Sequence, residues 1–176
     1  MKVFIAGPRA ISILNKDIKE RLNNIINNNF TILVGDANGI DKAIQKFCLE
    51  LNYNSINIFA SNGKARNNLG NWNIVNVDVP NSKKGFDFYV AKDLEMAKEA
   101  DYGFMIWNGK SKGTLNNMIN LSNLNKKVLV YFSPEKKFLT IRSLEDIKQV
   151  VDRCDLAVKD ILCECLNKDI QLSLNI

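Results

Sequence analysis

Three glycine-containing segments hold the residues best suited to binding an anion. Each of them follows a short apolar run: Gly7-Pro8-Arg9, residues 35–41 (GDANGID) and residues 108–114 (NGKSKGT). A glycine allows close approach of the backbone to a ligand, and the N–H groups that open a helix attract negative charge. The Arg9 guanidinium suits a phosphate or a carboxylate, either of which it can contact through two hydrogen bonds. We therefore predict that Gly7, Arg9 and the two longer segments bind a phosphate-bearing ligand.

The third segment is the strongest candidate. Trp107 ends the apolar run before it, and a helical period of apolar residues follows Thr114. We expect Gly109 and Gly113 to allow close backbone approach, and Ser111 and Thr114 to cap the helix or to bond a phosphate. The order of residues is neither that of a Walker A loop nor that of a GxGxxG fingerprint. The Trp107 ring is either a platform for stacking a base or part of the core.

The second segment presents carboxylates as well as glycines. Asp36 and Asp41 would repel a phosphate, so we interpret them as acceptors for ribose hydroxyls or base amines. In the alternative interpretation, Asp36 or Asn38 caps the following helix and Asp41 balances its dipole. The candidate ligand-binding residues of this segment are Gly35, Asp36, Asn38, Gly39 and Asp41.

Acidic residues are the remaining catalytic candidates, and the chain contains no histidine. This absence excludes Ser-His-Asp triads, Cys-His dyads and histidine-ligated metal sites, and no pair of cysteines has CxxC spacing. Asp93 and Glu95 lie in a predicted helix, and a carboxylate there could act as nucleophile or general base at a sugar carbon. In the alternative, both are solvated helix acids. We expect no metal and no cofactor.

Short apolar runs alternate with helical periods along most of the chain. This alternation predicts an α/β fold, a Rossmann-like three-layer sandwich with a mostly parallel sheet. Ligands bind such sheets beyond the carboxyl ends of the strands, so the three segments are expected to line one crevice. The predicted strands are 2–6, 30–34, 55–60, 73–77, 102–107 and 127–132, and the predicted helices are 14–25, 40–51, 88–99 and 114–124.

The end of the chain differs from the rest. Residues 143–146 (SLED) resemble the start of a helix, and apolar residues continue at helical spacing beyond them. The pattern fits one long helix or two helices joined near Asp155. We predict a Rossmann-like domain over residues 1–140 and a helical tail over 141–176, which packs on the same domain or at a dimer interface.

The net charge of +5 favours an acidic partner, and residues 110–137 hold six lysines and a single acid. Such a segment suits a phosphate-bearing ligand, a polynucleotide or simply solvent. The chain has no apolar run of the roughly 18 residues that a membrane span requires, and its first residues do not resemble a secretory signal. We therefore expect a cytoplasmic protein without a membrane partner.

Three stretches together resemble the SLOG superfamily of Rossmann-like domains, and within it the YspA/YpsA-like branch. They are the opening strand with Gly7-Pro8-Arg9, VGDANGIDKAIQKF (34–47) and AKDLEMAKEADYGFMIWNGKSKGTLNNM (91–118), and the resemblance covers about residues 2–132. It implies a site for nucleotides or nucleic-acid-derived ligands, and it suggests a homodimer. The glycine loops of such families bind phosphate and sugar, which implies Gly7, Arg9, Gly35, Asp36, Gly39, Asp41, Gly109, Ser111, Gly113 and Thr114.

Related branches imply three different activities. The LOG branch cleaves the base–ribose bond with a PGGxGTxxE motif, but asparagines stand at 116 and 117 where that glutamate is expected. The first prediction is therefore a protein that binds a nucleotide-like small molecule as a sensor or carrier. The alternative is an N-glycosidic hydrolase or transferase, since KVFIAGPR also resembles the opening of nucleoside 2-deoxyribosyltransferases. A second alternative is a single-stranded nucleic-acid-binding module like the DprA branch.

Overall fold

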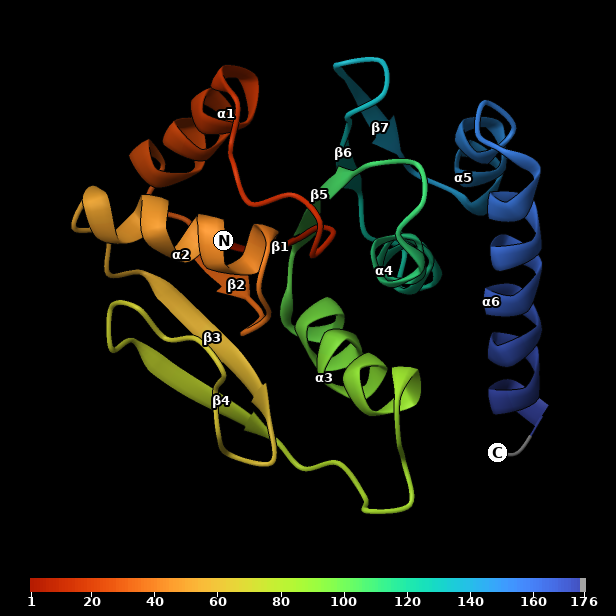
Figure 1. Ribbon diagram of the computed structural model, residues 1–176, viewed down its shortest axis with the longest axis horizontal. Coiled ribbons are helices and arrows are strands. Elements are labelled where there is room, and N and C mark those ends of the chain that lie inside the picture. Colours follow the sequence, from red (N-terminus) through yellow and green to blue (C-terminus); the bar gives the residue numbers. More distant parts are fainter. Residues whose placement is uncertain (175–176) are drawn as a thin grey trace.

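Apolar strands alternate with amphipathic helices over residues 1–174, the part of the chain that the computed structural model describes (Figure 1). The strands are β1 (Lys2–Ala6), β2 (Thr31–Val34), β3 (Ile56–Ser61), β4 (Asn73–Val77), β5 (Tyr102–Trp107), β6 (Val128–Phe132) and β7 (Lys137–Ile141). The helices are α1 (Lys16–Asn27), α2 (Ile40–Glu50), α3 (Phe86–Glu99), α4 (Lys112–Asn123), α5 (Leu144–Val151) and α6 (Leu156–Leu174).

The strands form one seven-stranded sheet in the order β4-β3-β2-β1-β5-β6-β7. All neighbours are parallel except β6 and β7, which are antiparallel. Side chains alternate between the two faces of a strand, so Val3 and Ile5 pack on α1 and α2, whereas Phe4 packs on the layer of α3 and α4. The predicted α/β fold, a Rossmann-like three-layer sandwich, is confirmed.

Strand β7 was not predicted from the sequence, because residues 127–132 were expected to form the last strand. The chain turns back through residues 133–136, where Lys136 adopts a positive φ of 52°. The strand that follows lies at the edge of the sheet, and most of its side chains are exposed or half-buried. An edge strand of this kind has a weak apolar pattern, which explains why the sequence did not reveal it.

The C-terminal helices form an additional layer outside α4. The two-helix alternative is observed: α5 ends at Val151, and α6 begins at Leu156. Val150 and Leu162 are buried in the same hydrophobic core as α4. Residues 175 and 176 of the predicted tail lie outside the described residues. Within the described chain, no helix is both long and apolar enough to cross a membrane.

Candidate ligand-binding cleft

A cleft of about 570 Å³ opens beyond the carboxyl ends of β1 and β5, between the first turns of α3 and α4. Its volume lies in the range typical of small-molecule sites. Seven of the residues selected from the sequence line it: Gly7, Arg9, Asp41, Asp93, Ser111, Gly113 and Thr114. Further lining residues, which were not in that selection, include Arg66, Tyr89, Lys92, Lys112, Asn116 and Asn117.

Gly7 and Gly39 hold the loops after β1 and β2 in close contact. A Cβ at Gly7 would lie 2.6 Å from the Ile40 Cγ1 atom and 2.9 Å from the Ile106 carbonyl oxygen. Gly39 has a φ of +82°, and a Cβ there would lie 2.4 Å from the Arg9 Cα atom. These glycines therefore bring the two loops together, and Gly39 is not among the cleft-lining residues.

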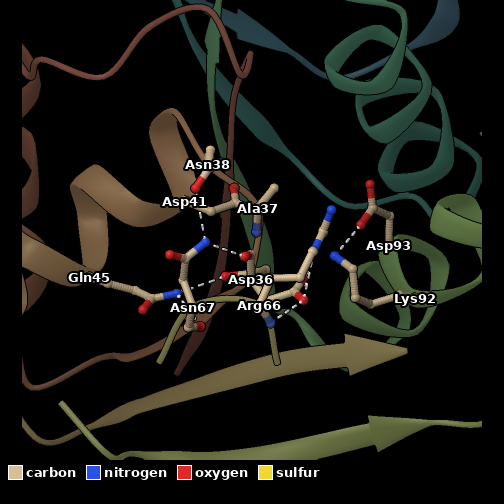
Figure 2. Close-up of polar contacts among 10 residues, drawn as sticks. Asp36, Ala37, Asn38, Asp41, Gln45, Arg66, Asn67, Lys92 and Asp93 are labelled. Carbon is tan, nitrogen blue, oxygen red and sulfur yellow. Dashed lines mark hydrogen bonds and ion pairs between the residues drawn. The ribbon is translucent and has the colours of Figure 1, made fainter. Parts of the chain in front are cut away.

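Asp36 binds Arg66 of the β3–β4 loop through two parallel hydrogen bonds (Figure 2). Arg66 Nη2 lies 2.7 Å from Asp36 Oδ1, and Arg66 Nε lies 3.0 Å from Asp36 Oδ2. Burial acts to raise the pKa of Asp36, but the hydrogen bonds from Arg66 outweigh it, so this pKa lies below its ordinary value. Asn38 likewise accepts a hydrogen bond from Asn67 Nδ2 at 3.1 Å. Both predicted ligand acceptors thus already hold the β3–β4 loop, and their contact with a ligand stays a prediction.

A buried lysine lies between two carboxylates on one side of the cleft. Figure 2 shows Lys92 beside Asp93, and the distance from Lys92 Nζ to Asp93 Oδ1 is 2.8 Å. A Cβ at Gly35 would lie 2.7 Å from this Nζ and 2.5 Å from Asp41 Oδ2, so only glycine leaves room for both side chains. The role of Gly35 is therefore to admit the charged cluster, and Gly35 itself does not line the cleft.

The charges of this cluster follow from burial and mutual attraction. Burial raises the pKa of Asp41 to about 6, and the nearby Lys92 only partly opposes that effect. Burial also acts to lower the pKa of Lys92, but Asp93 and Asp41 outweigh it and hold this pKa above its ordinary value. Lys92 is therefore positively charged at neutral pH, whereas Asp41 is expected to change charge near pH 6.

The loop before α4 is arranged to expose the start of that helix. Asn108 Oδ1 accepts hydrogen bonds from the backbone N–H groups of Lys110 and Ser111, at 3.1 and 2.9 Å. Ser111 Oγ in turn accepts from the Thr114 N–H and from Thr114 Oγ1, so Ser111 is the N-cap of α4. A Cβ at Gly113 would meet no heavy atom within 4 Å, so this part of the first turn borders open space in the cleft.

Besides Gly35, Asp36, Asn38 and Gly39, three further predicted site residues do not line the cleft. The Trp107 ring is fully buried against Phe132 and donates from Nε1 to the Ser111 carbonyl, so it belongs to the core and cannot stack on a base. Gly109, with a φ of +70°, faces Phe132 and Cys154. Glu95 is half-exposed and pairs with Lys98 at 2.7 Å. Of the two proposed catalytic acids, only Asp93 reaches the cleft.

Arg9 is a cation of the cleft that is available for a ligand. Arg66 and Lys92 are paired with aspartates, and Lys110 and Lys112 lie beside Asp155 and Glu164 of the C-terminal layer. Among residues 1–167, whose side chains the structure describes, none forms an ion pair with Arg9. Its guanidinium lies 4.9 Å from the centre of the Tyr89 ring, and Arg66 lies 4.8 Å from the same ring. Tyr89 therefore positions Arg9 beside the cleft.

Sequence reasoning did not select Lys92 or Tyr89. A lysine four residues before the buried Met96 lies on the same helix face, and this spacing is the signal that could have indicated its burial. Tyr89 gave no comparable signal, because the order of residues in α3 does not show which side faces Arg9.

Comparison with known proteins supports the fold. No family model and no curated protein matches the chain. A solved structure of DNA processing protein A from Helicobacter pylori, described for its unique mode of binding single-stranded DNA, is similar with a TM-score of 0.54. The identity is 16%, and the alignment covers 74% of this chain and 64% of that one. At this identity the likeness shows a shared Rossmann-like fold, and membership of the SLOG superfamily stays a prediction.

Proposed function

We propose that this protein binds a nucleotide or a nucleotide-derived small molecule in the cleft between α3 and α4. The observation that supports the proposal most strongly is the exposed first turn of α4 at Gly113, which lines the same cleft as Arg9. The first N–H groups of a helix have no partners within the helix, and together with the helix dipole they attract a phosphate. Arg9 would supply the compensating positive charge.

The acidic side of the cleft suits the remainder of such a ligand. Asp41 and Asp93 also line the cleft, and their carboxylates offer acceptors to hydroxyl or amine groups. Because Lys92 neutralises part of their charge, this side of the cleft does not simply repel an anion. A ligand that fits both features carries a phosphate at one end and N–H or O–H groups at the other, and a nucleotide has this pattern.

A negative charge at Gly113 is the most direct test. We expect Gly113→Asp to weaken the binding of AMP and of ribose 5-phosphate by about tenfold or more, because the carboxylate would occupy the proposed phosphate position. An acid in the first turn of a helix is favourable, so the variant is expected to stay folded. Isothermal titration calorimetry on both proteins measures the effect, and Gly113→Ala is the matched control with the same backbone change. Unchanged affinity in folded Gly113→Asp would refute the placement.

Cleavage of the N-glycosidic bond is a second candidate, because Asp93 is a carboxylate held at the cleft wall. Lys92 Nζ and Asn117 Nδ2 bind its two oxygens, at 2.8 and 3.2 Å. Asp93 would take a proton from a water molecule whose oxygen bonds to the sugar carbon as the C–N bond to the base breaks, and Asp93 would then return that proton to the departing base. Incubation with a nucleoside monophosphate and chromatography for free base tests this candidate. Activity that persists in Asp93→Asn would exclude Asp93 from the reaction.

Single-stranded nucleic acid is a third candidate, supported by the likeness to a DNA-binding protein. The basic segment 110–137 does not form one surface, however. Lys110 and Lys112 border the cleft, whereas Lys126 binds the carbonyl groups of Ala97 and Lys98 beyond the other end of α4. A polynucleotide would show an affinity that falls steeply with salt, and a small ligand would show a shallow dependence. A titration with a short oligonucleotide at several salt concentrations separates the two.

A further inference from the structure

The first turn of α4 carries a cation instead of an acid. Lys112 is the first residue of this helix, and the first turn holds no acidic residue. Four other helices, α1, α2, α3 and α5, have an acidic residue in that position. A carboxylate is favourable there and an ammonium is unfavourable, because the helix dipole is positive at its start. The start of α4 therefore combines two positive charges and has no negative charge of its own.

A carboxylate of the C-terminal layer compensates this charge. Lys112 Nζ donates to Glu164 Oε2 at 2.5 Å, although the two residues are 52 positions apart in the sequence. The hydrogen bond to Glu164 is the largest of the effects that hold the pKa of Lys112 above its ordinary value, and the attraction of Asp87 is smaller. Figure 1 shows α6, which carries Glu164, on the outer side of α4, whereas the cleft opens between α4 and α3.

The same ammonium also borders the cleft. Lys112 is a lining residue, and its Nζ lies 5.1 Å from the centre of the ring of Phe86, the first residue of α3, which lines the cleft as well. The Lys112 side chain is 32% exposed, so it is accessible to a ligand. Because a lysine has a flexible stem of four carbons, its ammonium is within reach of the proposed phosphate position at Gly113, the next residue.

We infer that Glu164 competes with the phosphate of a bound ligand for Lys112, so that the C-terminal layer lowers the affinity of the cleft. The inference rests on the proposed function, because it requires the phosphate at the first turn of α4. While Lys112 binds Glu164, its charge is largely neutralised, and a ligand must weaken this pair before it can use the ammonium. The Glu164 side chain is 61% exposed, and exposed ion pairs are weak, so a phosphate can break the contact. Ligand binding and the ion pair therefore oppose each other.

Removal of the carboxylate provides the first test. We expect Glu164→Gln to bind ribose 5-phosphate and AMP about three- to fivefold more tightly than the wild type, because the ion pair no longer opposes binding. Isothermal titration calorimetry at low ionic strength measures the change, since salt weakens interactions between exposed charges. Glu99→Gln is the matched control: it removes the same charge from an ion pair with Lys2, at the start of β1 and away from the cleft.

The outcomes of this test separate the inference from the proposed function. If the wild type binds the two compounds and Glu164→Gln binds them equally or more weakly, the inference is overturned and the phosphate site stands. An equal gain in Glu99→Gln also overturns it, because net charge alone then accounts for the effect. If neither the wild type nor Glu164→Gln binds either compound, the proposed function fails, and the inference fails with it.

A double-variant cycle provides the second test, because it shows whether Glu164 acts through Lys112. We expect the gain from Glu164→Gln to disappear when it is made in Lys112→Gln, since Glu164 then has no ammonium to bind. Lys112→Gln is expected to fold, because it removes an unfavourable cation from a helix start, and thermal unfolding of all four proteins checks this. A gain of the same size in the Lys112→Gln background would show that Glu164 simply repels the phosphate, and it would overturn the inference.

Discussion

Lys92 organises the charges at one side of the cleft. It is almost completely buried, and it lies beside Asp93 and close to Asp41. Removing either carboxylate would leave a buried cation with less compensation, which is costly. The absence of a side chain at Gly35 makes the arrangement possible. One glycine in the loop after β2 therefore determines whether a buried ion cluster can form.

The pH dependence of stability should report the protonation of Asp41. Burial raises the pKa of Asp41 to about 6, from an ordinary value of 3.8. Between these values the folded protein keeps the proton and the unfolded chain releases it. The resulting stabilisation is fully present below pH 3.8 and is lost as the pH rises through 6. We expect the free energy of unfolding of the wild type, relative to Asp41→Asn, to fall over this range and to level off above it.

Urea unfolding of both proteins in steps between pH 4 and pH 7 measures this difference. The asparagine variant is a suitable reference, because its amide oxygen can still accept the hydrogen bond from the Ala37 N–H that Asp41 Oδ2 accepts at 3.2 Å. If the difference in free energy of unfolding between the two proteins stays constant from pH 4 to pH 7, the pKa of Asp41 is not raised by folding.

At the scale of elements, helix starts determine where the polar groups of the cleft lie. Ser111 caps α4 and leaves the first turn open toward the cleft, and Gly85 precedes α3 at the same opening. Helix α5 begins with a complete capping box, in which Ser143 Oγ accepts from the Asp146 N–H and Asp146 Oδ2 accepts from the Ser143 N–H. The sequence motif predicted this start, because capping depends on residues only three positions apart.

Loss of the cap on α5 should be measurable. We expect Ser143→Ala to lower the free energy of unfolding by about 1 kcal/mol, because the Asp146 N–H loses its acceptor. Chemical denaturation measures the change, and Gln149→Ala, at an exposed position of the same helix, is the control. If the two variants lose equal stability, the capping box does not stabilise the protein as described.

At the scale of the whole molecule, the C-terminal layer is part of the core rather than an attachment to it. Val158, Leu162 and Cys165 of α6 are buried in the cluster that also contains the residues of α4. Lys112 at the start of α4 binds Glu164 of α6. The layer therefore supports the helix whose first turn opens onto the cleft, and Figure 1 shows α6 running along the outside of α5 and α4.

Two leucines of α6 test this integration. Leu162 is buried, whereas the Leu156 residue is 75% exposed. We expect Leu162→Ala to lower the free energy of unfolding by about 2 kcal/mol or more, since it leaves a cavity in the shared core. Leu156→Ala should change it by less than about 0.5 kcal/mol. Both values come from denaturant unfolding monitored by tryptophan fluorescence. If Leu162→Ala lowers the free energy of unfolding no more than Leu156→Ala does, α6 does not belong to the common core.

The sequence by itself determined the elements that repeat with a local period. Six of the seven strands and the helices between them follow from apolar spacing, and so does the position of the three glycine segments beyond the strand ends. These features depend on neighbours within one or two helical turns, or on the alternation of a strand. Gly113 and Thr114 could be placed at a helix start for the same reason.

Only the tertiary structure decided which side chains meet across the cleft. Arg66 is 30 residues from Asp36, and Asn117 is 24 residues from Asp93, so no local pattern links either pair. The same limit explains why Glu95 was selected and Lys92 was not, although they lie on one helix. Burial of a charged side chain depends on what packs against it from distant segments, and that packing is established when the sheet and its helices come together.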